Sequence, residues 1–202
     1  MNVRTLVILL LSILVFPQVA SAYPVQYAEQ FYKLFHTQLY RYPENYEENI
    51  WYLERALTSD FCNPLYALGR PINDSTDWAK YRALFKMHVN LKIIEQYRGL
   101  AAKFNREKAY FFNAPWKEEN LESLKIAEHF FRAALYYWPE ARRWARNAST
   151  KPWDHYEGIE AWEDERYRIM QGELDYGEII RMDLEHLGRV RAEFEAMDEN
   201  TY

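Results

Sequence analysis

The stretch 120–139 (NLESLKIAEHFFRAALYYWP) places the tightest constraint on how this chain can fold. Its apolar residues recur at steps of three and four and therefore share one face of a helix: Leu124, Ala127, Phe131, Ala134 and Trp138. Small residues alternate with large ones on that face, which lets a second helix approach closely and interlock. Proline cannot continue helical hydrogen bonding, so we expect Pro139 to end the helix.

The rest of the chain shows the same helical periodicity. It predicts further helices at 24–42, 46–57, 75–104, 153–171 and 175–197, the last two forming a pair split near Gly172. We expect Ser75 or Thr76 to cap the helix 75–104, and Gly99 inside it to mark a bend or a close contact. No stretch shows sustained strand alternation. We therefore predict an all-α fold of antiparallel helix pairs in an array, with an irregular helical bundle as the alternative.

Residues 1–22 have the pattern of an export signal. Arg4 supplies a positive charge, 6–16 is an apolar core, and a small-x-small signal peptidase motif ends at Ala22. Cleavage after Ala22 would leave 23–202 as a single domain, periplasmic or secreted. An uncleaved N-terminal anchor is the alternative.

The amino-acid composition excludes some classes of protein and of binding partner. One cysteine, Cys62, excludes a disulfide framework, and we expect it to be a small buried residue. The formal charge is -5 with acids and bases intermixed, so no basic block indicates a nucleic acid or an anionic membrane as partner. The 17 Tyr, 7 Trp and 11 Phe fit either a core of large amphipathic side chains or an aromatic binding surface.

The chain offers few signals for chemistry. None of the 5 histidines pairs with another at i+3 or i+4, and none follows a glutamate in the Glu-x-x-His ligand pattern. We expect His88 to be a hydrogen-bonded residue at the edge of the core and His129 to be solvated. A Gly-rich phosphate loop and a G-x-S-x-G elbow are both missing from the sequence. We therefore predict no enzyme activity, no catalytic residue, no metal and no cofactor.

One acidic run has two interpretations. It consists of Glu160, Glu163, Asp164 and Glu165. Such a run is typical of a solvated helix face. Two acids that converged in a cleft could instead serve as half of a glycosidase pair.

A family resemblance rests on Ala127, Phe131, Ala134 and Pro139. Their spacing, A-x3-F-x2-A-x4-P, resembles the second helix of a tetratricopeptide repeat (TPR). The aromatic-Pro-Glu form at 138–140 also occurs at 42–44. The resemblance covers one half-repeat and weaker fragments, because Pro115 interrupts the place of the first repeat helix. It implies a degenerate TPR-like array whose extended surface binds proteins or peptides.

The aromatic and charged character of the chain also resembles small periplasmic proteins of spirochaetes, including those of the flagellar motor collar. This resemblance implies a non-enzymatic scaffold that assembles with other proteins of the cell envelope. The alternative is a protein that binds a small ligand, a glycan or a peptide in a groove lined with Tyr and Trp.

The best candidate for partner binding is the run Arg142, Arg143 and Trp144. Two guanidinium groups beside an indole can hold an acidic or aromatic segment of another protein. The alternative is that Trp144 packs in the core while the two arginines pair with nearby acids.

Overall fold

The computed structural model describes residues 24–62, 72–108, 114–151, 158–198 and 200, and these confirm the all-α prediction. Their α-helices are α2 (Ala28–Arg41), α3 (Tyr46–Thr58), α4 (Ser75–Ala102), α5 (Lys117–Ser149), α6 (Glu160–Gln171) and α7 (Tyr176–Ala196). A π-helical turn, η1 (Lys103–Lys108), and a 3-10 turn, η2 (Ala114–Trp116), lie between α4 and α5. None of the described helices combines the length and the apolar character needed to cross a membrane. The predicted signal segment and its cleavage after Ala22 lie outside the described residues.

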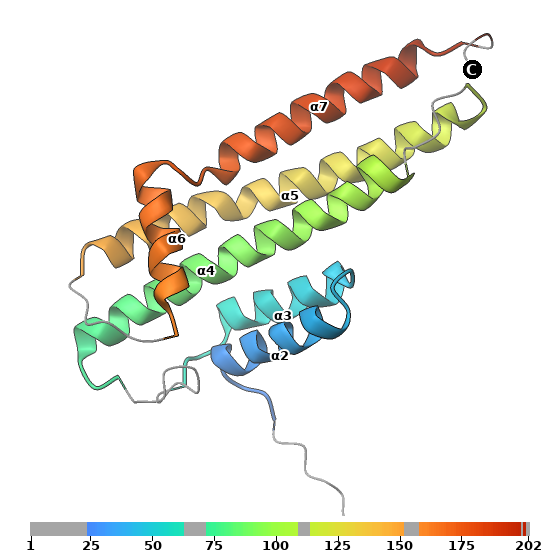
Figure 1. Cartoon of the computed structure of the whole chain (residues 1–202). Coiled ribbons are helices and arrows are strands. Elements are labelled where there is room, and N and C mark those ends of the chain that lie inside the picture. Colours follow the sequence, from blue (N-terminus) through green and yellow to red (C-terminus); the bar gives the residue numbers. More distant parts are fainter. Residues whose placement is uncertain (1–23, 63–71, 109–113, 152–157, 199, 201–202) are drawn as a thin grey trace, which may run out of the picture.

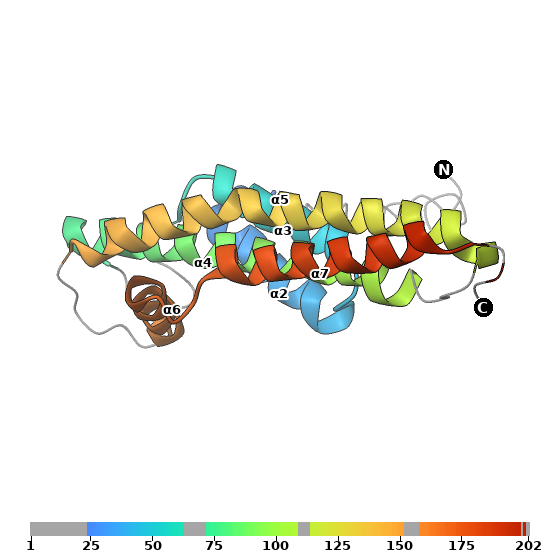
Figure 2. The ribbon, with the colours of Figure 1, turned by 90° about the horizontal axis from the view of Figure 1, so that it is seen from above.

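Five of the helices lie side by side in chain order, each running opposite to the one before it (Figure 1). The α2–α3 hairpin packs on α4, α4 runs along α5, and α7 packs on α5. α6 is the exception, because it crosses α4 and α5 near one end (Figures 1 and 2). The predicted pairing of α6 with α7 is therefore wrong, although Gly172 does end α6, in a left-handed conformation with φ of 77°.

The prediction that Pro139 ends its helix is wrong. α5 continues through Pro139 for ten further residues, to Ser149. Pro139 lies on the exposed side of the helix, where the carbonyl that loses its partner can bond to water. On the buried side the stripe of small and large residues continues past the proline through Trp138, Ala141, Ala145 and Ala148. Packing of this stripe along the whole helix outweighs the proline's cost of about 3 kcal/mol.

α4 is the central helix of the fold. It contacts α3, α5 and α6, and its buried residues lie on all sides rather than on one stripe. Its N-cap is Asp74 rather than the expected Ser75 or Thr76. The Asp74 carboxylate accepts hydrogen bonds from the backbone N–H of Thr76 at 2.7 Å and of Asp77 at 3.0 Å.

Two glycines let aromatic rings approach a helix backbone. A Cβ at Gly99 would collide with the ring of Tyr46, so the close contact expected at Gly99 is confirmed. A Cβ at Gly177, in the first turn of α7, would lie 2.8 Å from Cδ1 of the buried Trp138. Gly177 therefore lets α7 lie close to α5 at this point.

Two alanine substitutions in α7 test this close packing. We expect Gly177→Ala to lower the free energy of unfolding, because the new methyl group collides with a buried indole that has little room to move. Gly188→Ala is the matched control. No atom lies within 4 Å of a Cβ at Gly188, so we expect a gain of roughly 0.5–1 kcal/mol from helix propensity. Urea unfolding measures both changes, and a stabilised Gly177→Ala variant would contradict the packing of α7.

Candidate functional site

The predicted binding run is brought together with a lysine from another helix. Trp144 is partly buried on α5, and its ring has Arg143 Cζ at 4.3 Å and Lys86 Nζ, from α4, at 4.7 Å. Arg143 also pairs with Glu140, one turn earlier. Arg142 is exposed and makes no ion pair with the described residues. The indole thus packs against the core and also contacts two cations with its ring.

Further cations lie on the same two helices, although no contact within the described residues joins them to the indole, and the Arg82 guanidinium lies over the ring of Trp78 at 5.6 Å. Arg82 lies one turn before Lys86 on α4, and Arg146 follows Arg143 on α5 by three residues. Desolvation lowers the pKa of Lys86 first, and the charges of Arg82 and Arg143 lower it further. We call this group the Trp144 surface: Arg82, Lys86, Arg142, Arg143, Trp144 and Arg146. Its positive charges repel one another, and an anion placed among them would relieve that repulsion.

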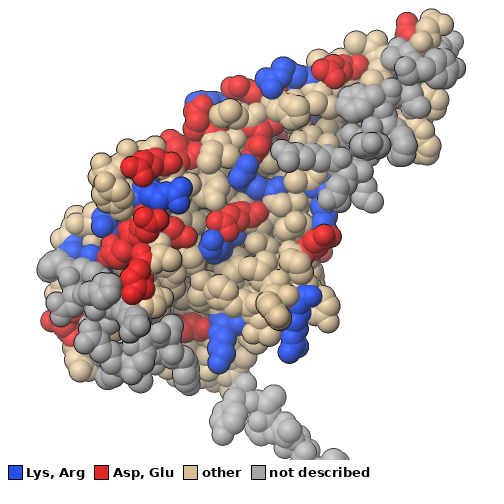
Figure 3. All heavy atoms as spheres, viewed as in Figure 1, with Lys and Arg blue, Asp and Glu red and all other residues tan. Residues whose placement is uncertain are grey.

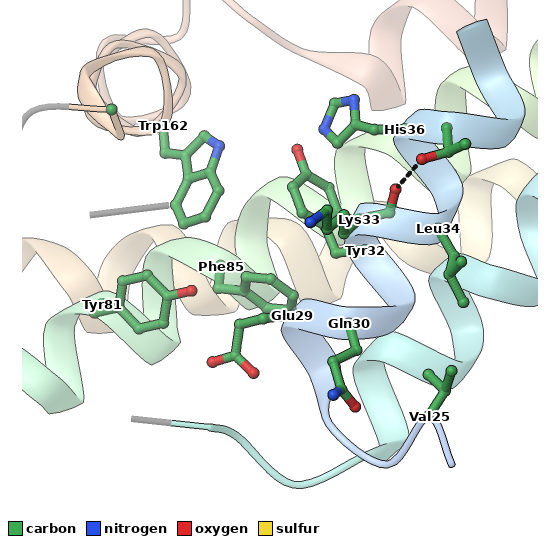
Figure 4. Close-up of a pocket in the computed structure, with 12 residues that line it drawn as sticks. Val25, Glu29, Gln30, Tyr32, Lys33, Leu34, His36, Tyr81, Phe85 and Trp162 are labelled. Atoms are coloured by element: carbon green, nitrogen blue, oxygen red, sulfur yellow. Dashed lines mark hydrogen bonds between the residues drawn. The ribbon is translucent and has the colours of Figure 1, made fainter. Parts of the chain in front are cut away.

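A second candidate site is a pocket of about 760 Å³ between α2, α4 and α6. Four aromatic side chains line it (Figure 4): Tyr32, Tyr81, Phe85 and Trp162. Three of the rings meet nearly at right angles, with Tyr32–Phe85 at 71°, Tyr32–Trp162 at 82° and Phe85–Trp162 at 76°. Their centroids lie 5.4–6.1 Å apart, which is ordinary edge-to-face contact. We call this the aromatic pocket.

A hydrogen-bonded chain lies beside this pocket and joins three helices. The hydroxyl of Tyr32 on α2 lies 2.6 Å from Nε2 of His88 on α4. Nδ1 of the same ring lies 2.5 Å from Oε2 of Glu165 on α6. His88 is only 5% exposed and stacks on Trp162. The prediction that His88 is a hydrogen-bonded residue at the edge of the core is confirmed.

The order hydroxyl, imidazole, carboxylate is also that of a nucleophilic triad, so its chemistry needs examination. Desolvation raises the pKa of Tyr32 first, and the nearby Glu165 charge raises it further. The phenol therefore stays protonated, and its O–H donates a hydrogen bond to Nε2 of His88. Nδ1 then donates to Glu165, so both ring nitrogens are occupied. This arrangement fits a structural link between α2, α4 and α6 rather than an activated nucleophile.

The acidic run on α6 is only partly the solvated face that was expected. Glu160 and Asp164 are exposed. Glu163 instead pairs with the buried Lys80 at 2.8 Å and with Arg166 at 2.6 Å. Glu165 binds His88, so the expectation is wrong for these two glutamates, which face α4. Figure 3 shows acidic side chains gathered on the surface where α6 lies in Figure 1.

Other predicted residues behave simply. His129 is exposed on α5, as expected. Cys62 is free and only partly buried, less than expected. In the part of the chain that the structure describes, no three His, Cys, Asp or Glu side chains gather as a possible metal site.

The link between α2, α4 and α6 can be tested with Tyr32→Phe. This change removes the donor to a buried nitrogen of His88, and we expect it to cost about 1–3 kcal/mol. Tyr40→Phe on the same helix is the control, because Tyr40 is 91% exposed and its loss is expected to be neutral. Chemical denaturation gives both values. Equal stability of the two variants would show that the Tyr32 hydroxyl contributes nothing.

Alkaline pH is expected to destabilise the fold, and a neighbouring pair of tyrosines tests this. Desolvation, followed by a 2.6 Å hydrogen bond to Glu54, raises the pKa of Tyr137 above its usual value of 10.0. Because its pKa is higher in the folded than in the unfolded protein, this tyrosine stabilises the fold below about pH 10. That contribution to the unfolding free energy is lost as the pH rises further. We expect unfolding free energy to fall between pH 9 and 11, more gently in Tyr137→Phe. Tyr136→Phe, at an exposed position, should keep the wild-type slope.

Comparison with known proteins gives one match. The family model of a domain of unknown function (DUF8513) matches residues 76–197, which run from the first turn of α4 to the residue after α7. No curated protein and no solved structure matches the chain. The Trp144 surface lies within the matched residues, whereas the aromatic pocket also uses α2, which lies before them. The match spans more than half of the chain, and the protein therefore belongs to this family, a domain of unknown function (DUF8513).

Proposed function

We propose that this protein is an exported, non-enzymatic scaffold that binds another protein of the cell envelope through the Trp144 surface. One observation carries the proposal: a partly buried indole holds the cations of Lys86 and Arg143 over its ring, and further arginines lie on the same two helices. The chain as a whole has a formal charge of -5, so this concentration of positive charge runs against its overall balance.

The chemistry of this surface favours an acidic partner segment. Arginine binds carboxylates with two parallel hydrogen bonds, and tryptophan and arginine are enriched among the residues that dominate binding energy. Glu140 already pairs with Arg143, which holds that guanidinium in place over the indole. Arg142 is exposed on the same helix and is available to a partner's carboxylate.

The broader setting comes from the sequence. The export pattern of residues 1–22 supports a periplasmic or secreted protein. The TPR-like spacing and the likeness to spirochaete periplasmic proteins support a role in assembly, with a complex of the flagellar motor as the specific setting. An array of antiparallel helices supports this role because it offers an extended surface.

A pull-down with matched charge reversals tests the proposal. The mature chain is used as bait on envelope extracts, and captured proteins are identified by mass spectrometry. We expect a partner that Arg142→Glu/Arg143→Glu loses and that high salt releases, since screening weakens exposed ion pairs. Arg181→Glu/Arg189→Glu on α7 is the control with the same change of charge. A partner retained equally by both variants, or no partner at all, would count against the Trp144 surface.

A second candidate function is the binding of a small ligand, a glycan or a peptide in the aromatic pocket. The observation that favours it is a volume of about 760 Å³ with four aromatic side chains in its walls. This volume falls in the range of small-molecule sites, which are lined mainly by apolar and aromatic groups with a few polar ones.

A further inference from the structure

One carboxylate in the aromatic pocket lacks a complete set of partners. Glu29, in the first turn of α2, lines the pocket. Its Oε2 accepts a hydrogen bond from the backbone N–H of Cys62 at 2.9 Å. Its Oε1 is buried and has no hydrogen-bond partner among the described residues. Desolvation raises the pKa of this carboxyl group, and backbone hydrogen bonds, the one from Cys62 first, act in the opposite direction.

The surroundings of Glu29 are aromatic and carry a second polar group. Tyr81 is 1% exposed, and its hydroxyl has no hydrogen bond to the described residues. In Figure 4 the Glu29 carboxylate and the Tyr81 hydroxyl point into the same part of the pocket. The rings of Phe85 and Trp162 lie beside them. This end of the pocket therefore offers hydrogen-bond acceptors within aromatic walls.

Positive charges lie elsewhere around the pocket. Lys33 also lines it, but is an exposed residue on α2. His36 lines it too, and desolvation lowers the pKa of its imidazole, so this ring supplies no positive charge at neutral pH. Glu29 and Lys33 are one turn apart and form no ion pair, so Lys33 does not neutralise the partly buried carboxylate. Lys80, on the neighbouring turn of α4, pairs with Glu163. The inner end of the pocket thus carries the Glu29 carboxyl group, and the cation among its lining residues, Lys33, is exposed to solvent.

We propose that the aromatic pocket binds a small protonated amine that has an apolar body. The ammonium group meets the Glu29 carboxylate, and its N–H groups donate to that carboxylate while the Cys62 N–H stays bonded to it. The apolar body lies against the rings of Phe85, Tyr81 and Trp162, whose faces also favour a cation. This inference rests on the second candidate function, ligand binding in the pocket, and adds the chemical class of the ligand.

Other ligand classes fit the same groups less well. A carboxylate or phosphate would meet the charge of Glu29 at the inner end. A quaternary ammonium ion has no N–H to donate, so the buried oxygen would stay without a partner. A neutral apolar molecule would gain the ring contacts but would leave Glu29 uncompensated.

A pair of ligands of matched shape tests the choice of charge. The full chain is titrated with 2-phenylethylammonium and, separately, with 2-phenylethanol, and binding is followed by tryptophan fluorescence and by calorimetry. We expect the amine to bind about tenfold more tightly than the alcohol or better, since a hydrogen bond to a charged group contributes at least that factor. Equal binding of the two would leave the pocket as a small-ligand site and would overturn the preference for an amine. If neither ligand bound at up to millimolar concentration, both the small-ligand site and its preference for an amine would be overturned.

Two glutamine substitutions test whether Glu29 is responsible. Glu29→Gln keeps an oxygen that can accept from the Cys62 N–H, so the fold is expected to persist. We expect this variant to lose about tenfold in affinity for the amine and to bind the alcohol as the wild type does. Glu47→Gln, an exposed position on α3, makes the same change of charge outside the pocket and should alter neither. An equal loss for both ligands in Glu29→Gln would overturn the role of its charge.

Discussion

The structure depends on covering α4 from every side. This helix buries residues around its whole circumference, so one neighbouring helix cannot shield it from water. α3 of the hairpin, α5 and α6 each cover part of it. α5 in turn carries one long apolar stripe, with Leu124, Ala127 and Ala134 fully buried, and α7 covers what α4 leaves. The order in which the helices pack follows from which apolar surface each of them covers.

Polar contacts fix how the α2–α3 hairpin sits on the core. Tyr32 is bonded to His88, and Asn49 donates to Gln96 at 3.0 Å within the buried interface. Such contacts have a narrow range of geometry, so they select one register where apolar packing alone would tolerate several. The same placement brings α2 against α6 and forms the aromatic pocket. The hairpin therefore completes a site that α4 and α6 do not make by themselves.

Helix positions were predictable because apolar periodicity is a local signal. α3 begins at the expected residue, and α4 and α7 differ from expectation by one or two residues at their ends. Pro139 shows the limit of local rules. Proline was expected to end the helix, yet the stripe continued in the sequence through Ala141, Ala145 and Ala148. The packing of some thirty residues, rather than one backbone hydrogen bond, decided where α5 ends.

The sequence by itself determined the all-α class, the helices and the run Arg142–Trp144, because adjacent residues on one helix stay together in any fold. Only the tertiary structure decided that Lys86 lies on Trp144, and that Tyr32, His88 and Glu165 meet. In this hydrogen-bonded chain Tyr32 lies 56 residues before His88, and His88 lies 77 residues before Glu165. No spacing in the sequence indicates that these three residues meet. In the sequence, Glu29 likewise looks like an ordinary acidic residue in the first turn of a helix. The burial of its Oε1, which has no hydrogen-bond partner among the described residues, arises only when distant parts of the chain pack against α2.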